Sequence, residues 1–324
     1  MSTPSAYAGL VDRLIAGAVP HVPQPLVRRL ARPYVAGTTL EDALRTTRDL
    51  HADGLLASVD VVGEAVTNER AALAAADEYI EVAGALKQQA LGADVSLKPS
   101  GLGSGLGWEV AGRHIDRVVA HAEGLGTFVR IDMEDSSTTE ATLALYRDLR
   151  ARGRQGVGLV LQSRLWRTAT DVEALADLKP NVRLCKGIYL EPPRVAMQDR
   201  DAIRVSFSSL LRRLLKNGSY VAIATHDEEL IVDALAALAE AGASREAYEF
   251  QTLLGVRPDL ARMLARDHTV RVYVPYGPDS YAYAQRRLRE NPQIAGYVAR
   301  DVLHTLARGL RRRPAQPPME DPHD

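Results

Sequence analysis

Short apolar runs alternate along this chain with longer amphipathic stretches, from about residue 54 to residue 273. Eight runs rich in β-branched residues are predicted to be strands: 55–61, 95–98, 127–132, 156–162, 181–186, 220–224, 248–251 and 270–273. Seven stretches between them have helical periodicity: 69–91, 113–123, 138–152, 171–178, 199–216, 227–241 and 257–266. Regular alternation of this kind predicts βαβ units and a parallel sheet.

Eight strands, each followed by a helix, predict an α/β fold that closes into a (βα)8 TIM barrel. A doubly wound sheet would instead place a Gly-rich turn at the start of a helix after an early strand. The glycines of segment 101–107 follow the second run, but their irregular spacing favours a flexible loop that does not open a helix.

The ends of the chain differ from its centre. Residues 1–53 are expected to form a small N-terminal helical arm packed on the barrel, with helices over 25–31 and 38–51. Thr38 and Glu41 have the spacing of a capping box at the start of the second helix. The barrel is expected to be the catalytic domain and to span 54–310, and the tail 311–324, rich in proline and charge, is expected to be disordered.

Composition narrows the class of protein. The chain has 324 residues, 46% of them hydrophobic and 25% charged, as in an ordinary soluble protein. The formal net charge of −1 favours neither nucleic acid nor anionic lipid as a partner. Cys185 is the single cysteine, which suits a reducing cytoplasm, and neither a signal peptide nor an apolar stretch of membrane-spanning length is evident.

Polar residues gather where the predicted strands end. They are Lys98, Asp132, Gln162, Arg183, Lys186, Thr225, His226 and Gln251. Barrel enzymes take their catalytic groups from these carboxyl ends, so we expect an active site there. Arg130 and Asp132 lie on the same side of their strand, whereas Lys186 has the opposite parity to Arg183. Lys186 therefore lies beyond its strand or follows a bulge.

A helix is also expected near the C-terminus, with four polar residues on one face: Tyr283, Arg286, Arg287 and Glu290. Two adjacent guanidiniums suit bidentate binding of a carboxylate or phosphate. A solvated helix with an Arg–Glu pair is the alternative. With Lys98, Arg183 and Lys186, these arginines predict a cationic mouth for an anionic ligand, such as a small carboxylate together with a phosphate-bearing cofactor.

Several short motifs occur in a specific order. They are Ser96-Leu97-Lys98, Arg130 to Glu134, Leu161-Gln162, Val182 to Tyr189, Ala224-Thr225-His226, Glu249-Phe250-Gln251 and Tyr283-x-x-Arg286-Arg287-x-x-Glu290-Asn291. In this set, from about residue 55 to residue 300, the chain resembles the proline dehydrogenase family in its small monofunctional bacterial form. The resemblance implies a distorted (βα)8 barrel whose last helix lies over the active site.

The resemblance also implies roles for residues. Arg286 and Arg287 would hold the proline carboxylate with help from Lys98, Tyr283 would shape the pocket, and Glu290 would position the arginines. Asp132 and Arg183 match active-site positions, with Arg183 near the flavin N5. Positions that match FAD contacts are Met133, Gln162, Arg183, Lys186, Gly187, Ile188, Thr225 and His226. The chain departs from the family's common pattern at Ile188, where alanine is frequent, and at Ser163-Arg164, where Ala-Tyr is frequent.

The implied reaction is FAD-dependent oxidation of L-proline to 1-pyrroline-5-carboxylate, by hydride transfer to flavin N5. This is the first step of proline catabolism to glutamate. The family passes its electrons to a membrane quinone, so we expect a cytoplasmic protein with peripheral contact at the inner face of the cell membrane. A separate pyrroline-5-carboxylate dehydrogenase is the expected partner for the second oxidation.

The residues alone leave two other functions open. Lys98 and Lys186 at strand ends would suit a Schiff-base lyase or aldolase, because a desolvated lysine can react as an amine. A non-catalytic barrel that binds an anionic metabolite is the other. No metal is expected, since the eight histidines show no H-E-x-x-H spacing, and a G-x-S-x-G nucleophile turn is also lacking.

Overall fold

The computed structural model describes residues 32–63, 65–278 and 280. The helix predicted over 25–31, the tail 311–324 and the polar helix with Tyr283, Arg286, Arg287 and Glu290 lie outside the described residues. The prediction that the last barrel helix covers the active site falls on the same undescribed stretch.

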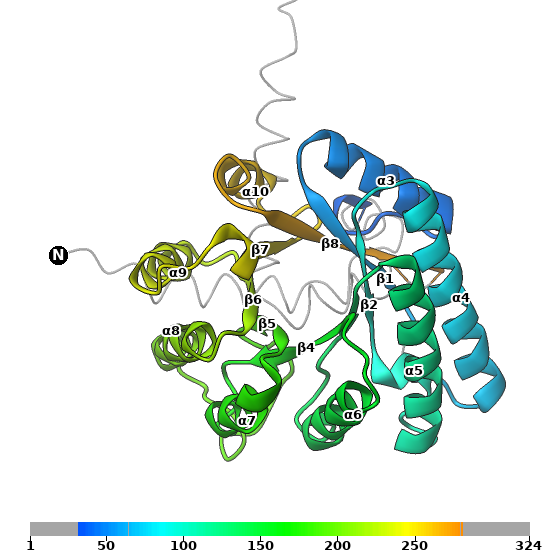
Figure 1. The fold of residues 1–324 in the computed structure, drawn as a ribbon, viewed down its shortest axis with the longest axis horizontal. Helices are drawn as coiled ribbons and strands as arrows, with labels where there is room; N and C mark the ends of the chain where they lie inside the picture. The colour runs from blue at the N-terminus through cyan, green and yellow to red at the C-terminus, as the bar shows by residue number, and fades with distance from the viewer. Residues whose placement is uncertain (1–31, 64, 279, 281–324) are drawn as a thin grey trace, which may run out of the picture. The chain divides into compact units, whose positions relative to one another are not determined.

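Eight parallel strands close into a barrel in the order of the sequence (Figure 1). They are β1 (Leu56–Val61), β2 (Asp94–Leu97), β3 (Val129–Ile131), β4 (Val157–Gln162), β5 (Asn181–Cys185), β6 (Tyr220–Ala224), β7 (Tyr248–Leu253) and β8 (Val270–Tyr276). β1 pairs with β8, in register Ser58 to Tyr273, and this pairing closes the ring. The predicted barrel is confirmed.

Helices surround the strands (Figure 1). They are α3 (Leu40–Ala52), α4 (Glu69–Gln88), α5 (Trp108–Leu125), α6 (Thr139–Ala151), α7 (Thr168–Leu175), α8 (Arg200–Lys216), α9 (Glu228–Glu240) and α10 (Pro258–Leu264). The described residues also form 3-10 turns: η2 (Arg32–Tyr34), η3 (Pro99–Leu102), η4 (Ala176–Leu178) and η5 (Arg245–Ala247). Helix α3 precedes the barrel in sequence and packs against β1 and β8.

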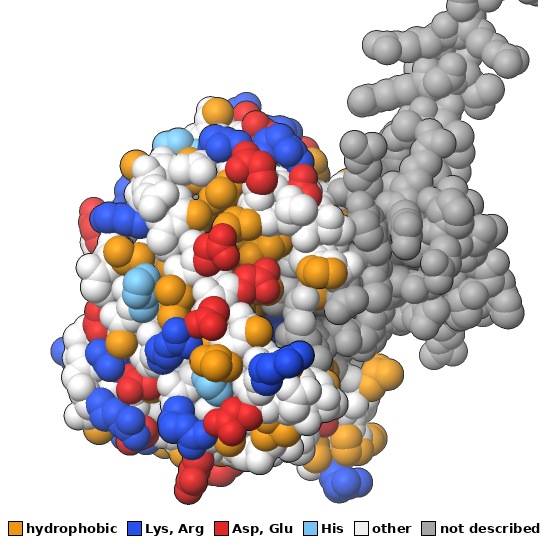
Figure 2. Space-filling view, turned by 90° about the vertical axis from the view of Figure 1, so that its right-hand side faces the viewer, with side chains coloured by type: hydrophobic (Ala, Val, Ile, Leu, Met, Phe, Trp, Pro, Cys, Tyr) orange, Lys and Arg blue, Asp and Glu red, His pale blue; other side chains and the backbone are white. Residues whose placement is uncertain are grey.

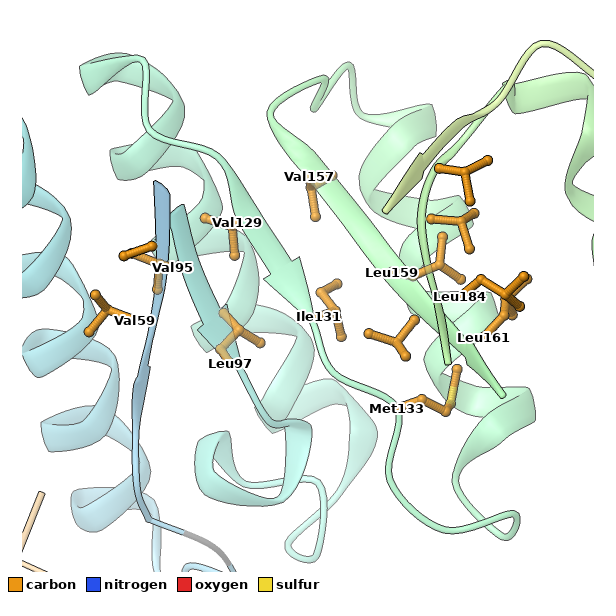
Figure 3. Packing of buried hydrophobic residues seen from close by; sticks show 14 of the residues in the cluster. Val59, Val95, Leu97, Val129, Ile131, Met133, Val157, Leu159, Leu161 and Leu184 are labelled. Carbon is orange, nitrogen blue, oxygen red and sulfur yellow. The ribbon is translucent and has the colours of Figure 1, made fainter. Parts of the chain in front are cut away.

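Alternate residues of each strand face the helices, and nearly all of these residues are apolar. One large buried cluster joins strand residues such as Val95, Val129 and Leu159 to helix residues such as Val118 and Leu149. Figure 3 shows the strand side chains of this cluster on the sheet, with the helices beside it. Burial of apolar area stabilises the fold by roughly 25 cal/mol per Å², so this outer layer holds the barrel together.

The residues of opposite parity face the inside of the barrel, and most of them are polar. They include Ser58, Asp60, Asp94, Ser96, Arg130, Asn181, Arg183, Glu249, Gln251, Arg271 and Tyr273. Bulky aliphatic side chains usually fill such an interior. Here, polar side chains joined by hydrogen bonds and ion pairs fill the interior. They form one layer near the amino ends of the strands and another near the carboxyl ends.

Gly158 on β4 leaves space for the Arg130 side chain in the amino-end layer. The Arg130 guanidinium reaches across β4 and donates to the carbonyls of Leu159, at 3.1 Å, and Asn181, at 2.9 Å. A Cβ on Gly158 would lie 2.7 Å from Arg130 Nη1 and 2.5 Å from the Asn181 carbonyl oxygen. The absence of a side chain on β4 therefore makes room for the arginine.

Two local predictions are wrong. The capping box of α3 uses Thr39 and Asp42 rather than Thr38 and Glu41, because the Thr39 backbone is extended and its hydroxyl accepts from the Asp42 N–H at 3.2 Å. Segment 101–107 was expected not to open a helix, but Gly107 directly precedes α5, which begins five residues earlier than predicted.

Two glycines of segment 101–107, Gly101 and Gly103, serve close packing. A Cβ on Gly101 would lie 2.5 Å from the Gly63 carbonyl oxygen, and Gly103 has a φ of +99°. Leu102 between them is fully buried. Glycine permits the close backbone approach at the first position and the positive φ at the second at low cost.

Charges of both signs are mixed on the outer helices. Figure 2 shows acidic and basic side chains interspersed over the face that lies at the right of Figure 1. Helices α4 and α5 are joined by two ion pairs, Arg113–Glu69 at 2.8 Å and Arg117–Asp77 at 2.6 Å. Neither sign dominates this face, so it carries no extended field.

Candidate active site

Arg183 and Asp132 meet at the carboxyl end of the barrel interior. Arg183 Nη1 donates to Asp132 Oδ1 at 2.6 Å, although β3 and β5 are separated by β4. The Ser96 hydroxyl donates to the same carboxylate oxygen at 2.8 Å, and Gln251 Oε1 accepts from Arg183 Nε. The buried guanidinium also donates to the hydroxyls of Ser96, at 3.2 Å, and Ser58, at 3.4 Å. It is therefore held by residues of β1, β2 and β7 and by Asp132, which follows β3.

A second ion pair lies beside the first. Lys98 Nζ is 2.8 Å from both carboxylate oxygens of Asp60 and 3.7 Å from Asp132 Oδ2. The Tyr273 hydroxyl lies 3.0 Å from Lys98 Nζ and donates to Asp132 Oδ2 at 3.0 Å. Tyr273 thus links the two ion pairs, and its ring also lies 5.3 Å from the Arg183 guanidinium carbon.

The two carboxyl groups differ in their surroundings. Burial raises the pKa of Asp60 above its ordinary value, although the Lys98 ammonium opposes this effect. Burial would also raise the pKa of Asp132, but the charges of Arg183 and Lys98 outweigh it and hold this pKa below the ordinary value. Asp132 is therefore a carboxylate that accepts hydrogen bonds at neutral pH.

The ends of β4, β5 and β6 bring together the residues predicted to bind FAD. Gln162 and Cys185 are in register, as are Cys185 and Ala224, so Lys186 and Thr225 follow at one level. Gln162 Nε2 donates to the Glu134 carbonyl at 2.8 Å, next to buried Met133.

The residues after β5 include a close backbone approach. Gly187 has a φ of +97°, and a Cβ there would lie 2.7 Å from Gln162 Oε1. Half-buried Ile188 follows it. Of the two alternatives for Lys186, a place beyond its strand or a bulge, the structure shows the first, because β5 ends at Cys185.

His226 is held as a neutral ring. Burial first, then the charges of Lys186 and Arg257, lower its pKa to about 4. The Leu253 N–H donates to His226 Nε2 at 3.0 Å, so the neutral ring carries its proton on Nδ1. Nδ1 is consequently a hydrogen-bond donor at neutral pH.

Three residues of the site were not predicted from the sequence, and two of them are acidic and lower its positive charge. Asp60 and Asp227 each bind one of the predicted cations: Lys98 pairs with Asp60, and Lys186 Nζ lies 3.0 Å from Asp227 Oδ2. Tyr273, the third, was taken only as the end of a strand. Among the described residues, each predicted cation of the site has a carboxylate partner, so this part of the mouth is close to neutral.

These arrangements were compared with known proteins. A profile of the family described as "Proline dehydrogenase" matches residues 43–300. The chain belongs to the proline dehydrogenase family. "Proline dehydrogenase 1" of Bacillus subtilis is 38% identical to it over 84% of this chain and 90% of that protein. "Proline dehydrogenase" of Deinococcus radiodurans is 36% identical over 91% and 99%, respectively.

Parts of larger proteins of known structure share the fold. Proline utilization A from Bdellovibrio bacteriovorus, inactivated by N-propargylglycine, superposes with a TM-score of 0.76 at 22% identity. The match covers 86% of this chain and 34% of that one. Within the described part of this family member, no helix is long and apolar enough to cross a membrane.

Proposed function

We propose that this protein oxidises L-proline to 1-pyrroline-5-carboxylate with FAD as its resident cofactor. The observation that carries the proposal is the fixed Arg183–Asp132 pair, placed at the carboxyl end of the barrel in a chain of the proline dehydrogenase family. When bound, FAD would supply the redox chemistry by accepting a hydride at N5.

The donor set at the ends of β4 to β6 fits such a cofactor. Lys186 and the Nδ1–H of His226 offer positive charge and a hydrogen-bond donor, which suit phosphate oxygens. Gln162 and Thr225 add polar side chains, and Gly187 lets the backbone lie close to Gln162. Met133 and Ile188 contribute apolar surface of the kind that an isoalloxazine ring needs.

Arg183 has a specific part in this proposal. We place its guanidinium near N5 and the C2 carbonyl region of the cofactor, where a positive charge stabilises added negative charge. Asp132, Ser96 and Gln251 hold the guanidinium in one orientation before substrate binds. A group that needs no rearrangement during the reaction lowers the barrier more than a mobile one.

The substrate would be held by its carboxylate. Arg286 and Arg287 would bind the two oxygens, with Glu290 holding the arginines, Tyr283 shaping the pocket against the ring and Lys98 contributing charge. Lys98 is already fixed by Asp60 and Tyr273. The hydride would leave from the ring carbon that is bonded to nitrogen and does not bear the carboxylate, and the nitrogen would lose its proton to give the C=N bond of the product.

The product and the electrons require further partners. We propose a membrane quinone as the electron acceptor, with the protein in the cytoplasm and in peripheral contact with the inner face of the cell membrane. A separate pyrroline-5-carboxylate dehydrogenase would carry out the second oxidation towards glutamate.

The structure gives little support to a Schiff-base lyase. A lysine that attacks a carbonyl must react as a free amine. Both strand-end lysines instead bind carboxylates, Lys98 on Asp60 and Lys186 on Asp227.

The test is a visible absorption spectrum of the purified protein before and after anaerobic addition of L-proline. We expect flavin absorption that bleaches with L-proline and not with D-proline. A flavin spectrum unchanged by L-proline would contradict the proposed substrate. A colourless protein that does not bind added FAD would contradict the proposed cofactor.

A further inference from the structure

A chain of hydrogen bonds connects the two polar layers of the barrel. Arg183 in the carboxyl-end layer donates through Nε to Gln251 Oε1, and Gln251 Nε2 donates to Glu249 Oε1. Glu249 belongs to the amino-end layer, where Arg271 Nε lies 2.9 and 3.0 Å from its two oxygens. Glu249 and Gln251 are two residues apart on β7, so both face the interior.

The direction of these hydrogen bonds is determined by Glu249. The side chain is 1% exposed, and the Arg271 charge outweighs the effect of burial, so its pKa lies below the ordinary value. An ionised carboxylate can only accept hydrogen bonds. Gln251 must therefore turn its NH2 group towards Glu249, which leaves its carbonyl oxygen to face Arg183.

The opposite orientation of the Gln251 amide would be unfavourable. Its NH2 group would face the Arg183 Nε–H, donor against donor, and its oxygen would face a carboxylate. Gln251 is 4% exposed, so water cannot readily replace the missing partners. Leaving buried donors unsatisfied costs about 1–3 kcal/mol each.

We infer that Glu249 is a positioning residue for Arg183: by fixing the Gln251 amide, it holds the guanidinium against the flavin side of the site. This inference rests on the proposed function, in which Arg183 stabilises reduced flavin. Neither Glu249 nor Arg271 reaches Arg183 directly among the hydrogen bonds of the described residues, so their influence passes through Gln251.

Glu249→Gln tests the inference because it keeps the shape of the side chain but supplies an NH2 group that competes for the Gln251 oxygen. Asp94→Asn is a matched control: Asp94 Oδ2 also binds Arg271 Nε, at 3.2 Å, without a hydrogen bond to Gln251. Both variants disturb the amino-end layer, but only the first disturbs the amide.

The readout is the midpoint potential of the bound flavin in the holoenzyme. We expect Glu249→Gln to weaken the preference for reduced over oxidised flavin by about tenfold, which lowers the potential by about 30 mV for a two-electron couple. Asp94→Asn should leave it unchanged. Equal shifts in both variants, or a shift in neither, would overturn the inference. Gln251→Met removes the amide while leaving Glu249 on Arg271, and an unshifted potential there would overturn it too.

A second measurement does not depend on flavin. In the FAD-free protein, Glu249→Gln should lower the melting temperature less in an Arg183→Lys background than in the wild type, because lysine lacks the Nε–H that Gln251 accepts. Asp94→Asn should shift it equally in both. Additive effects of Glu249→Gln and Arg183→Lys would overturn the positioning role. If the wild type binds no FAD, the proposed function fails while this cycle still decides whether Glu249 positions Arg183.

Discussion

Lys98 and Asp60 form an ion pair inside the barrel in which the ammonium lies 2.8 Å from both carboxylate oxygens. Asp60 is fully buried and Lys98 nearly so. Each charge of such a buried ion pair offsets the desolvation of the other, because either charge alone would be costly to bury.

Lys98→Met should therefore destabilise the protein by about 3–5 kcal/mol, since it leaves a buried carboxylate without its cation. The double variant Lys98→Met/Asp60→Asn should recover part of that loss. Urea denaturation of the wild type, both single variants and the double variant measures the coupling. Additive losses would show that the two residues do not depend on each other.

Asp132→Asn should slow flavin reduction by proline by roughly tenfold or more. Without its carboxylate, the Arg183 guanidinium can move, and a buried guanidinium without a counter-charge destabilises the site by several kcal/mol. Stopped-flow absorbance after anaerobic mixing with proline measures the rate. Ser96→Ala is the matched control, as it removes hydrogen bonds of a neutral hydroxyl, to Asp132 Oδ1 at 2.8 Å and from Arg183 Nη1 at 3.2 Å, but leaves the carboxylate charge in place. Equal rates for Asp132→Asn and Ser96→Ala would contradict a special role for the charge.

Arg286→Ala or Arg287→Met should raise the KM for proline by roughly tenfold to a hundredfold, the usual cost of losing a charge-assisted hydrogen bond. The FAD content should stay at the wild-type level. Gln285→Ala, on the opposite side of the same helical pattern, serves as the control. An unchanged KM in both arginine variants would remove the carboxylate clamp from the mechanism.

The neutral state of His226 predicts a loss of stability in acid. Its pKa is about 4 in the folded protein and is ordinarily 6.5, so the unfolded chain binds more protons between these values. The free energy of unfolding should fall as pH decreases from 6.5 to 4, by at most about 1.4 kcal/mol per pH unit. Denaturation at several pH values should show a smaller fall in His226→Gln, and parallel curves would contradict the assignment.

Asp94 should act in the opposite direction over nearly the same range. Burial raises its pKa from 3.8 to about 6, so the folded protein binds more protons than the unfolded chain between these values. Its contribution to stability is lost as pH rises from 3.8 to 6. Relative to the wild type, Asp94→Asn should therefore gain stability as pH rises through this window. A difference that does not vary with pH would count against the shifted pKa.

Gly158→Ala should destabilise the protein by about 1–3 kcal/mol or more, because the added methyl group meets Arg130 and a rigid backbone oxygen. Thermal unfolding measures the loss. Gly105→Ala is a control, since a Cβ there meets nothing within 4 Å. If the two variants melt alike, Arg130 does not need the space over β4.

The alternation of strands and helices predicted most of the fold, and the polar residues at strand ends predicted part of the site. The eight strands lie within a few residues of their predicted bounds, because apolar β-branched runs between helices have few other stable arrangements. Asp132 and Arg183 were both expected at strand ends, but their 2.6 Å contact was not. That distance depends on barrel closure, which brings together residues 51 positions apart.

The missed residues left a weaker signal in the sequence. Asp60 lies inside an apolar run, so attention to strand ends alone passes over it, and Tyr273 was taken only as the end of a run that continues to Tyr276 in the structure. Each nevertheless alternates with a second polar residue, Ser58 for Asp60 and Arg271 for Tyr273. Polar residues at every second position of a strand predict a polar barrel interior. This pattern is easily overlooked, because the interior of such barrels is usually aliphatic.

The ion pairs of the barrel interior restrict how such a protein can change. Lys98 with Asp60, and Arg271 with Glu249, join residues on different strands that are far apart in the chain. A substitution of one member of a pair leaves the other as an unpaired buried charge, which destabilises the protein. Folded variants with a different pair are therefore reached only when both residues change together. Libraries that randomise both members of a pair together should therefore retain many more folded clones than libraries that vary the same positions one at a time.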